Sequence, residues 1–140
     1  MFWDKTITLY NRYENDETGE IIWYRHLFHN CFVKQTNNKT NVGGVQLTTT
    51  DNIIRIPAQD NYIPPYDWKK TPNSIKGKKP TLQVGDLIFL AEINDIIDEN
   101  TSGQRSSDLI AKYKALGSVF VTSVNINTSL PNAHYFVKGE

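Results

Sequence analysis

Residues 5–28 read KTITLYNRYENDETGEIIWYRHLF, and this stretch decides the fold class. Apolar and polar side chains alternate along residues 5–10, and the alternation resumes over residues 20–28. A period of two is typical of a β-strand with one buried face. The segment between the two is polar and ends in Thr18-Gly19, a turn signal, so the stretch predicts a β-hairpin.

Several short strands are expected after this hairpin, because β-branched and apolar runs recur between turn residues. His29-Asn30 is a candidate interruption of the pairing, and residues 37–44, which are polar and contain glycine, predict a loop. A turn is expected over residues 127–132. The further predicted strands are residues 31–35, 45–49, 53–56, 87–91, 119–126 and 134–138. Of these, residues 87–91 are continuously apolar, as in a central strand covered on both faces.

One helix is predicted, over residues 106–116. Ser106 or Ser107 is expected to cap its first turn, and Gly117 is expected to end it. An apolar stripe with i, i+4, i+7 spacing gives the helix one face to bury. The stripe consists of Leu109, Tyr113 and Leu116. The predicted architecture is therefore mainly β, a small antiparallel β-barrel or sandwich with one short helix packed across it.

The length of 140 residues predicts a single domain, residues 1–140. The 15 basic and 15 acidic residues balance, which argues against a dedicated nucleic-acid binder. Cys31 is the one cysteine, so an intrachain disulfide and a cysteine-based zinc site are excluded. The N-terminus lacks a signal-peptide pattern, and the longest apolar run, residues 87–91, is far shorter than a membrane span. We therefore expect a soluble protein made in the cytoplasm, with no membrane partner.

Motifs of catalysis are not found in the sequence: no phosphate loop, dinucleotide-binding glycine motif, nucleophile elbow or zinc-protease helix occurs. His26 and His29 are three residues apart, which on a strand points them to opposite faces and argues against a shared metal. Cys31 is expected to be a buried structural thiol, with a catalytic thiol served by His29 as the alternative. No catalytic, cofactor or metal site is predicted, and the protein is expected not to be an enzyme. A metal-dependent or thiol enzyme is the weakest hypothesis.

An acidic cluster follows the central strand. A solvated acidic loop is the favoured interpretation, and a calcium site or an electrostatic contact with a basic partner are the alternatives. The cluster consists of Glu92, Asp95, Asp98 and Glu99. The spacing of an EF-hand loop is absent.

Residues 58–80 form a different kind of segment, with four prolines and no periodicity, and they predict a long Pro- and Lys-rich loop. Loops of this length in a compact domain are usually functional or disordered. Tyrosine and tryptophan anchor protein interfaces, whereas lysines interleaved with aromatic residues also bind single-stranded nucleic acid. We favour protein docking, with a solvated loop and nucleic-acid binding as alternatives. The candidate interface residues are Tyr62, Pro64, Pro65, Tyr66, Trp68, Lys69, Lys70, Lys76, Lys78 and Lys79.

The order of these elements carries a resemblance to a known family. The residues that carry it are Thr6–Tyr10, Ile22–Arg25, Val84–Leu90, Ser107–Tyr113, Phe120–Asn125 and Ala133–Gly139. They resemble the head-completion proteins (also called head-closure, stopper or head–tail connector proteins) of tailed phages and prophages of Gram-positive bacteria. In that family a tryptophan often follows the histidine of the closing segment, and Tyr135 stands there in this chain.

The resemblance implies a β-barrel subunit in a homo-oligomeric ring, a hexamer or dodecamer, in the neck of the virion. The ring would be assembled in the host cytoplasm, lie between portal or adaptor proteins above and tail proteins below, and help to retain packaged DNA. Residues 58–80 are the candidate for contacts with neighbouring subunits or with DNA. Deleting residues 62–79 is expected to leave a folded barrel that no longer joins heads to tails. The alternatives are a tail terminator, a minor capsid protein, or a single-strand nucleic-acid-binding barrel.

Overall fold

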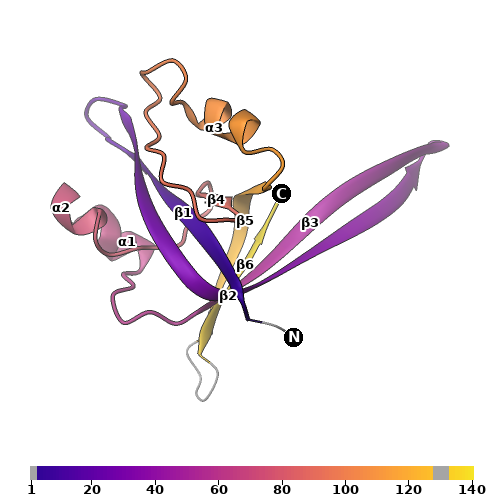
Figure 1. Cartoon of the computed structure of the whole chain (residues 1–140), viewed down its shortest axis with the longest axis horizontal. Helices are drawn as coiled ribbons and strands as arrows, with labels where there is room; N and C mark the ends of the chain where they lie inside the picture. The colour runs from indigo at the N-terminus through magenta and orange to yellow at the C-terminus, as the bar shows by residue number, and fades with distance from the viewer. Residues whose placement is uncertain (1–2, 128–132) are drawn as a thin grey trace.

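Six antiparallel strands close into a barrel in the order β1-β2-β3-β6-β5-β4 (Figure 1). The computed structural model describes residues 3–127 and 133–140, with every side chain in these ranges except those of residues 37, 38, 40 and 47–50. The strands are β1 (Lys5–Glu14), β2 (Ile21–Val42), β3 (Val45–Pro57), β4 (Leu87–Phe89), β5 (Ser118–Asn127) and β6 (His134–Gly139). The prediction of a mainly β fold is confirmed. The sequence left a barrel and a sandwich open, and the chain forms the barrel. Most of the predicted turn at residues 127–132 lies outside the described residues.

The predicted first hairpin is confirmed by the pairing of β1 with β2, with Thr8 opposite Leu27. The interruption predicted at His29-Asn30 is a β-bulge, because the pairing shifts between Lys5 and Ile7 of β1. Asn30 has a φ of 59° there, a left-handed conformation that asparagine adopts more readily than most residues. A bulge bends its strand and raises its twist. Beyond the bulge, β2 leaves β1 and pairs with β3.

A long hairpin replaces the loop predicted at residues 37–44. Strand β2 runs to Val42, and a tight turn at Gly43-Gly44 leads into β3. These glycines have φ values of 58° and 82°, the two positive angles that a type I′ hairpin turn requires. Barrel pairing of β3 with β6 starts at Asn52, opposite Gly139. Among the described residues, 36–51 pair only with each other, in seven cross-strand pairs that project from the barrel; we call this two-stranded ribbon the arm (residues 36–51) (Figure 1).

Strand β4 is buried on both faces, as its apolar sequence predicts. Ile88 points into the barrel, whereas Leu87 and Phe89 belong to a second cluster between the barrel wall and α3 (Ser106–Lys112). The barrel core consists of Ile7, Leu9, Phe28, Cys31, Ile54, Ile56, Leu82, Ile88, Val119, Val121, Tyr135 and Val137. The outer cluster consists of Tyr10, Leu87, Phe89, Ile93, Ile97 and Leu109. The single predicted helix thus covers the barrel where β1 meets β4.

Helix α3 is confirmed but is shorter than predicted, and it ends at Lys112. Leu116 therefore leaves the predicted apolar stripe and is 46% exposed. The serine cap was also wrong, because Ser106 is already the first helical residue. Two carboxylates satisfy the free backbone donors instead: Asp108 accepts from the backbone N–H of Arg105 at 3.1 Å, and Glu99 accepts from that of Ser106 at 2.8 Å.

A buried carboxyl group fixes the turn that leads into β4. Asp86 is fully buried and accepts hydrogen bonds from the Asn11 amide (2.8 Å) and from the backbone N–H groups of Arg12 (2.9 Å) and Gln83 (3.0 Å). Burial raises the pKa of Asp86 to about 7, and these donors act in the opposite direction. The side chain thereby ties the Gly85-Asp86 turn to the middle of β1.

Replacing Asp86 with asparagine is expected to lower the free energy of unfolding by about 1–3 kcal/mol, because an amide has only one acceptor oxygen for three donors. At least one buried N–H group then loses its partner. Urea unfolding of the variant and of wild type measures the difference. Asp98→Asn is the matched control: its carboxylate lies in a surface turn and accepts from Asn100 and Thr101, so a change below about 1 kcal/mol is expected. Equal effects of the two substitutions would contradict the role given to Asp86.

Candidate functional site

The segment predicted as a long loop, residues 58–80, is folded against the first hairpin, on the face of β1 and β2 that carries Leu9 and Phe28 into the barrel core and opposite the face covered by α3; we call it the cap (residues 58–80) (Figure 1). It contains α1 (Pro65–Lys69) and α2 (Asn73–Lys76). Pro65 is the first residue of α1, where its fixed φ and missing N–H fit the first turn, and Pro72 immediately precedes α2. Each helix is about one turn long, so the sequence has no helical period to show.

Trp68 points into the protein. Its side chain is fully buried, and its indole N–H donates to the carbonyl of Lys79 at 3.0 Å. Two tyrosines from the first hairpin make T-shaped contacts with its ring, with centroid distances of 6.2 Å for Tyr13 and 5.7 Å for Tyr24. Such edge-to-face contacts add to the burial of the ring. Trp68 therefore anchors the cap to the barrel and is not available to a partner.

Lys76 is also internal, with a side chain that is 2% exposed. Its ammonium group donates to the carbonyls of Lys69, at 3.1 Å, and Thr71. It lies over the ring of Tyr13, 4.6 Å from the centroid, and 5.4 Å from that of Trp68. Desolvation lowers the pKa of Lys76, and the carbonyls and rings replace part of the lost water. This lysine holds the two cap helices together.

His26, on β2, joins the barrel to the cap. Its Nε2–H donates to the carbonyl of Lys76 at 3.0 Å, and burial lowers its pKa to about 4. His29 lies on the exposed surface, with Nδ1 3.2 Å from the Thr6 hydroxyl. The two histidines have separate partners, and only His29 is exposed. In the part of the chain that the structure describes, no group of three His, Cys, Asp or Glu residues is placed to hold a metal ion.

The buried His26 gives stability a defined pH dependence. Its folded pKa of about 4 lies below the unfolded value of 6.5, so the unfolded state binds more protons between those pH values. The contribution of His26 is complete above pH 6.5 and is lost as the pH falls, by up to about 1.4 kcal/mol per pH unit. His26→Gln retains an N–H donor but does not titrate. We therefore expect the variant to gain stability relative to wild type as the pH falls from 6.5 to 4.5, measured by urea unfolding. A constant difference would contradict this assignment.

The outward face of the cap exposes more lysines than acids, four lysines against Asp60 and Asp67. Its exposed members among the candidate interface residues are Pro64, Tyr66, Lys69, Lys70, Lys78 and Lys79; we call these four lysines with Tyr66 the lysine surface. Tyr66 is 73% exposed, and the Lys70 ammonium lies 3.9 Å from its ring centroid. Tyr62 is half-buried and stacks on Tyr135 at 4.6 Å. Of the three cap aromatics, Tyr66 alone is free to stack on a base, so the surface suits charge contacts better than base stacking.

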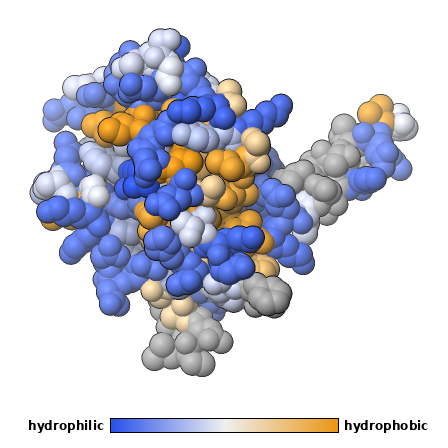
Figure 2. Space-filling view, viewed as in Figure 1, coloured by the Kyte–Doolittle hydropathy of each residue, from blue (hydrophilic) through white to orange (hydrophobic). Residues whose placement is uncertain are grey.

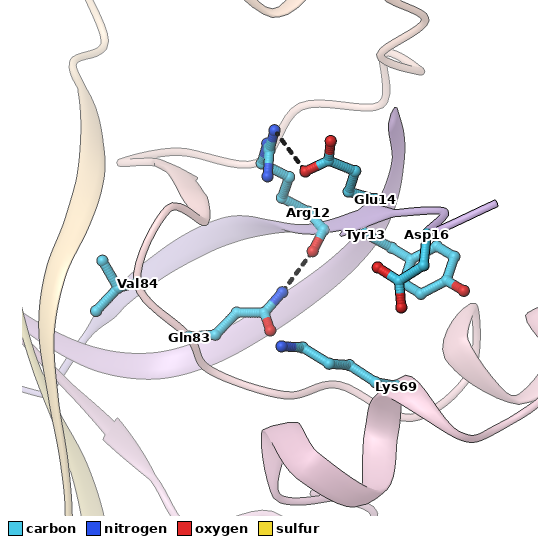
Figure 3. Close-up of a pocket in the computed structure, with 7 residues that line it drawn as sticks. All are labelled: Arg12, Tyr13, Glu14, Asp16, Lys69, Gln83 and Val84. Carbon is cyan, nitrogen blue, oxygen red and sulfur yellow. Dashed lines mark hydrogen bonds and ion pairs between the residues drawn. The ribbon is translucent and has the colours of Figure 1, made fainter. Parts of the chain in front are cut away.

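A polar pocket of about 290 Å³ lies beside the lysine surface (Figure 3). It is lined by Arg12, Tyr13, Glu14, Asp16, Lys69, Gln83 and Val84. Figure 3 shows Lys69 extending from α1 toward Gln83, whose side-chain amide donates to the Arg12 carbonyl at 2.5 Å. Arg12 pairs with Glu14 at 3.7 Å. The cationic and anionic side chains balance, and the lining has no nucleophile next to a base.

Cys31 is completely buried, and burial raises its pKa to about 12. Its thiol donates to the carbonyl of His29 at 3.7 Å. A thiol held protonated inside the barrel is a poor nucleophile, because the thiolate is the reactive form. The structural interpretation of this cysteine fits its surroundings.

The acidic cluster after β4 is used mostly within the chain, rather than being solvated as predicted. Asp95 accepts from the Lys112 ammonium at 2.9 Å and from the Tyr113 hydroxyl at 2.5 Å. These bonds lower the pKa of Asp95. Glu99 accepts from the Trp23 indole N–H at 3.2 Å as well as capping α3. The carboxylates thus hold the segment before α3 against the barrel.

The arm is the accessible feature that sequence reasoning missed. Its tip carries Val42 and Val45, which are 58% and 60% exposed, and Figure 2 shows an apolar spot at its far end. The signal in the sequence was Val42-Gly43-Gly44-Val45, since two glycines between β-branched residues are typical of a two-residue hairpin turn.

The described residues define a small closed β-barrel protein with two accessory elements, the arm and the cap. The chain belongs to DUF6751, a family of unknown function, whose model matches residues 2–140. No curated protein and no solved structure matches the chain. No helix within residues 3–127 and 133–140 is both long and apolar enough to cross a membrane.

Proposed function

We propose that this protein is a structural subunit of the phage neck, which forms a ring that joins the portal and head to the tail and helps to retain packaged DNA. The observation that carries the proposal is the arm. A two-stranded hairpin on its own is marginally stable in water, and the described part of the chain gives residues 36–51 no third strand. The arm is therefore suited to being supported by a neighbouring molecule.

The placement of the arm and the cap supports a connecting role. They project from different sides of the barrel, so one subunit is able to touch two partners at once (Figure 1). The lysine surface offers Lys69, Lys70, Lys78 and Lys79 to negatively charged groups. DNA phosphates in a channel and acidic protein faces both fit this charge. The order of elements that resembles head-completion proteins adds to the proposal.

A different position in the same particle, as a tail terminator or minor capsid protein, remains the second candidate, because a barrel with an arm fits those positions too. Binding of single-stranded nucleic acid is less well supported. Trp68 is buried and Tyr62 is half-buried against Tyr135, so Tyr66 is the one cap aromatic left to stack on a base.

The proposal is tested by a phage in which the gene is inactivated. We expect DNA-filled heads that leak DNA and separate, complete tails, because the joint between them is missing. Adding the purified protein to such a lysate is expected to restore tailed, infectious particles. Normal tailed particles from the inactivated phage would contradict the proposal.

A further inference from the structure

The outward side chains of β2, β3, β6 and β5 form a continuous surface on one wall of the barrel. Beyond the bulge these strands are neighbours in the order β2-β3-β6-β5 (Figure 1). Ile54 and Val137 point into the barrel core, so the residues next to them along β3 and β6 point outward. We call six of the outward residues, which lie in two adjacent cross-strand rows, the outer sheet face. They are Phe32, Arg55, Phe136 and Asn125 in the first row, and Lys34 and Lys138 in the second.

Planar groups fill the first row. Arg55 lies between Phe32 and Phe136, directly opposite both. Its guanidinium carbon is 4.9 Å from the centroid of the Phe136 ring, and its Nη1 is 3.2 Å from Nε2 of His134. Both phenylalanines are half-buried, and the centroid of the Trp3 ring is 6.3 Å from that of Phe32. The row therefore holds two rings and a guanidinium plane in fixed positions at the surface of the sheet.

Positive charge lies beside these planar groups. Lys34 and Lys138 are each opposite Ile53 in the second row, and both are exposed. The Lys138 ammonium is 5.7 Å from the centroid of the Phe136 ring. With Arg55, the outer sheet face has three cations and no acid, although the chain as a whole has a net charge of zero.

Carboxylates of the described residues leave these cations without a partner. The two ion pairs between described side chains lie elsewhere, at Arg12 and at Lys112. Along β3 the next acid on this side of the sheet is Asp51, at the base of the arm. The outer sheet face is thus a local surplus of positive charge, and it complements an anionic ligand.

This combination of groups fits a single-stranded nucleic acid. Unpaired bases stack on aromatic rings and on guanidinium planes, and lysines follow the phosphate backbone. The exposed amide of Asn125 offers both a donor and an acceptor to the edge of a base. A duplex keeps its bases inside its own stack, so it would engage the lysines but not the rings. An acidic protein would also meet the lysines, but lysine is depleted in the cores of protein interfaces.

We propose that the outer sheet face binds single-stranded nucleic acid, with bases on the planar groups of the first row and phosphates on Lys34 and Lys138. This is a second site, separate from the lysine surface of the cap, whose exposed aromatic residue is Tyr66. Three cations predict a slope of about −2 for the logarithm of the binding constant against that of salt, at about −0.7 for each phosphate neutralised. The site does not depend on the neck assignment.

Fluorescence anisotropy of a labelled oligothymidylate of about ten nucleotides measures binding by the full chain, since a small barrel contacts about 4–16 nucleotides. Phe136→Leu removes the ring but keeps an apolar side chain, and it is expected to raise the Kd about tenfold, within the range for one lost base stack. Phe136→Tyr restores a ring and should bind as wild type does. A purely structural role of Phe136 would not separate these two variants in this way.

Charge variants test the phosphate contacts. Lys34→Ala with Lys138→Ala is expected to weaken binding and to reduce the salt slope to about −0.7, because one cation remains. Both lysines are exposed, so the fold is expected to tolerate the change. Lys69→Ala with Lys70→Ala removes the same charge from the lysine surface of the cap. It is the matched control and should bind the oligonucleotide as wild type does.

Four results would overturn this assignment. The first is no binding with about 0.1 mM protein in about 10 mM salt, where charge contacts are least screened. The second is an equal loss of affinity in the two double-lysine variants, and the third is a duplex that binds as tightly as the single strand. The fourth is a glutamate peptide that displaces the oligonucleotide as well as unlabelled oligonucleotide does, which would assign the face to an acidic protein. All four concern the purified protein and leave the result with the inactivated phage unchanged, so the site and the neck assignment fail separately.

Discussion

Replacing Trp68 with alanine is expected to lower the free energy of unfolding by about 3–5 kcal/mol, the range for large aromatic residues removed from a core. The substitution empties the space between α1 and the first hairpin and removes the indole bond to Lys79. It also exposes one side of the site that holds the Lys76 ammonium. Urea unfolding followed by circular dichroism measures the loss without relying on the fluorescence of the deleted tryptophan.

Tyr66→Ala is the matched control, because Tyr66 lies in the same helix but faces solvent. A change within about 0.5 kcal/mol is expected there. If Trp68→Ala were equally mild, the cap would be a loosely attached segment and the lysine surface would have no fixed geometry.

Shortening the arm is expected to abolish the joining of heads to tails while leaving the barrel folded. Residues 37–50 are removed, and Thr36 is linked to Asp51 through Asn-Gly, a favoured two-residue hairpin turn. The free energy of unfolding should stay within about 1 kcal/mol of wild type, because none of the removed side chains that the structure describes belongs to either core cluster. Phage carrying this variant should yield DNA-filled heads and separate tails, counted by electron microscopy and plaque titre.

The control keeps the arm at full length, with Thr48, Thr49 and Thr50 replaced by serine, and should support normal titres. Full infectivity with the shortened arm would remove the observation that carries the proposed function. Deletion of residues 62–79, by contrast, no longer serves as such a test. It would strip Trp68 and Lys76 from the first hairpin, so the prediction that a folded barrel remains does not fit the structure.

The barrel was predictable from sequence wherever one face of a strand is apolar. The first hairpin shows period-two alternation, and the continuous apolar run of β4 indicates burial on both faces. The strands of the arm could not be recognised by an apolar face, and the reason is physical. A ribbon that projects from the barrel needs no apolar alternation, so its threonines and asparagines resemble a loop in the sequence until the Gly43-Gly44 turn is recognised.

Among the candidate interface residues, the burial of Trp68 and Lys76 could not be predicted from the sequence. Composition marked residues 58–80 as unusual, and the exposed lysines are there. Burial of Lys76 depends on carbonyls from Lys69 and Thr71 and on rings from Tyr13 and Trp68. Those groups meet only after the cap folds onto β1, so no local sequence pattern predicts that Lys76 is buried. The spacing of the acids after β4 does not show their contacts either. Glu99 caps α3 and binds the Trp23 indole, and Asp95 binds Lys112.

The most direct test of the neck assignment is quantitative mass spectrometry of purified, DNA-filled phage particles that encode this chain. We expect a few copies per particle, in a fixed ratio to the portal protein, as a single ring requires. Hundreds of copies would place the chain in the capsid or tail tube, and absence from the particles would contradict the structural role altogether.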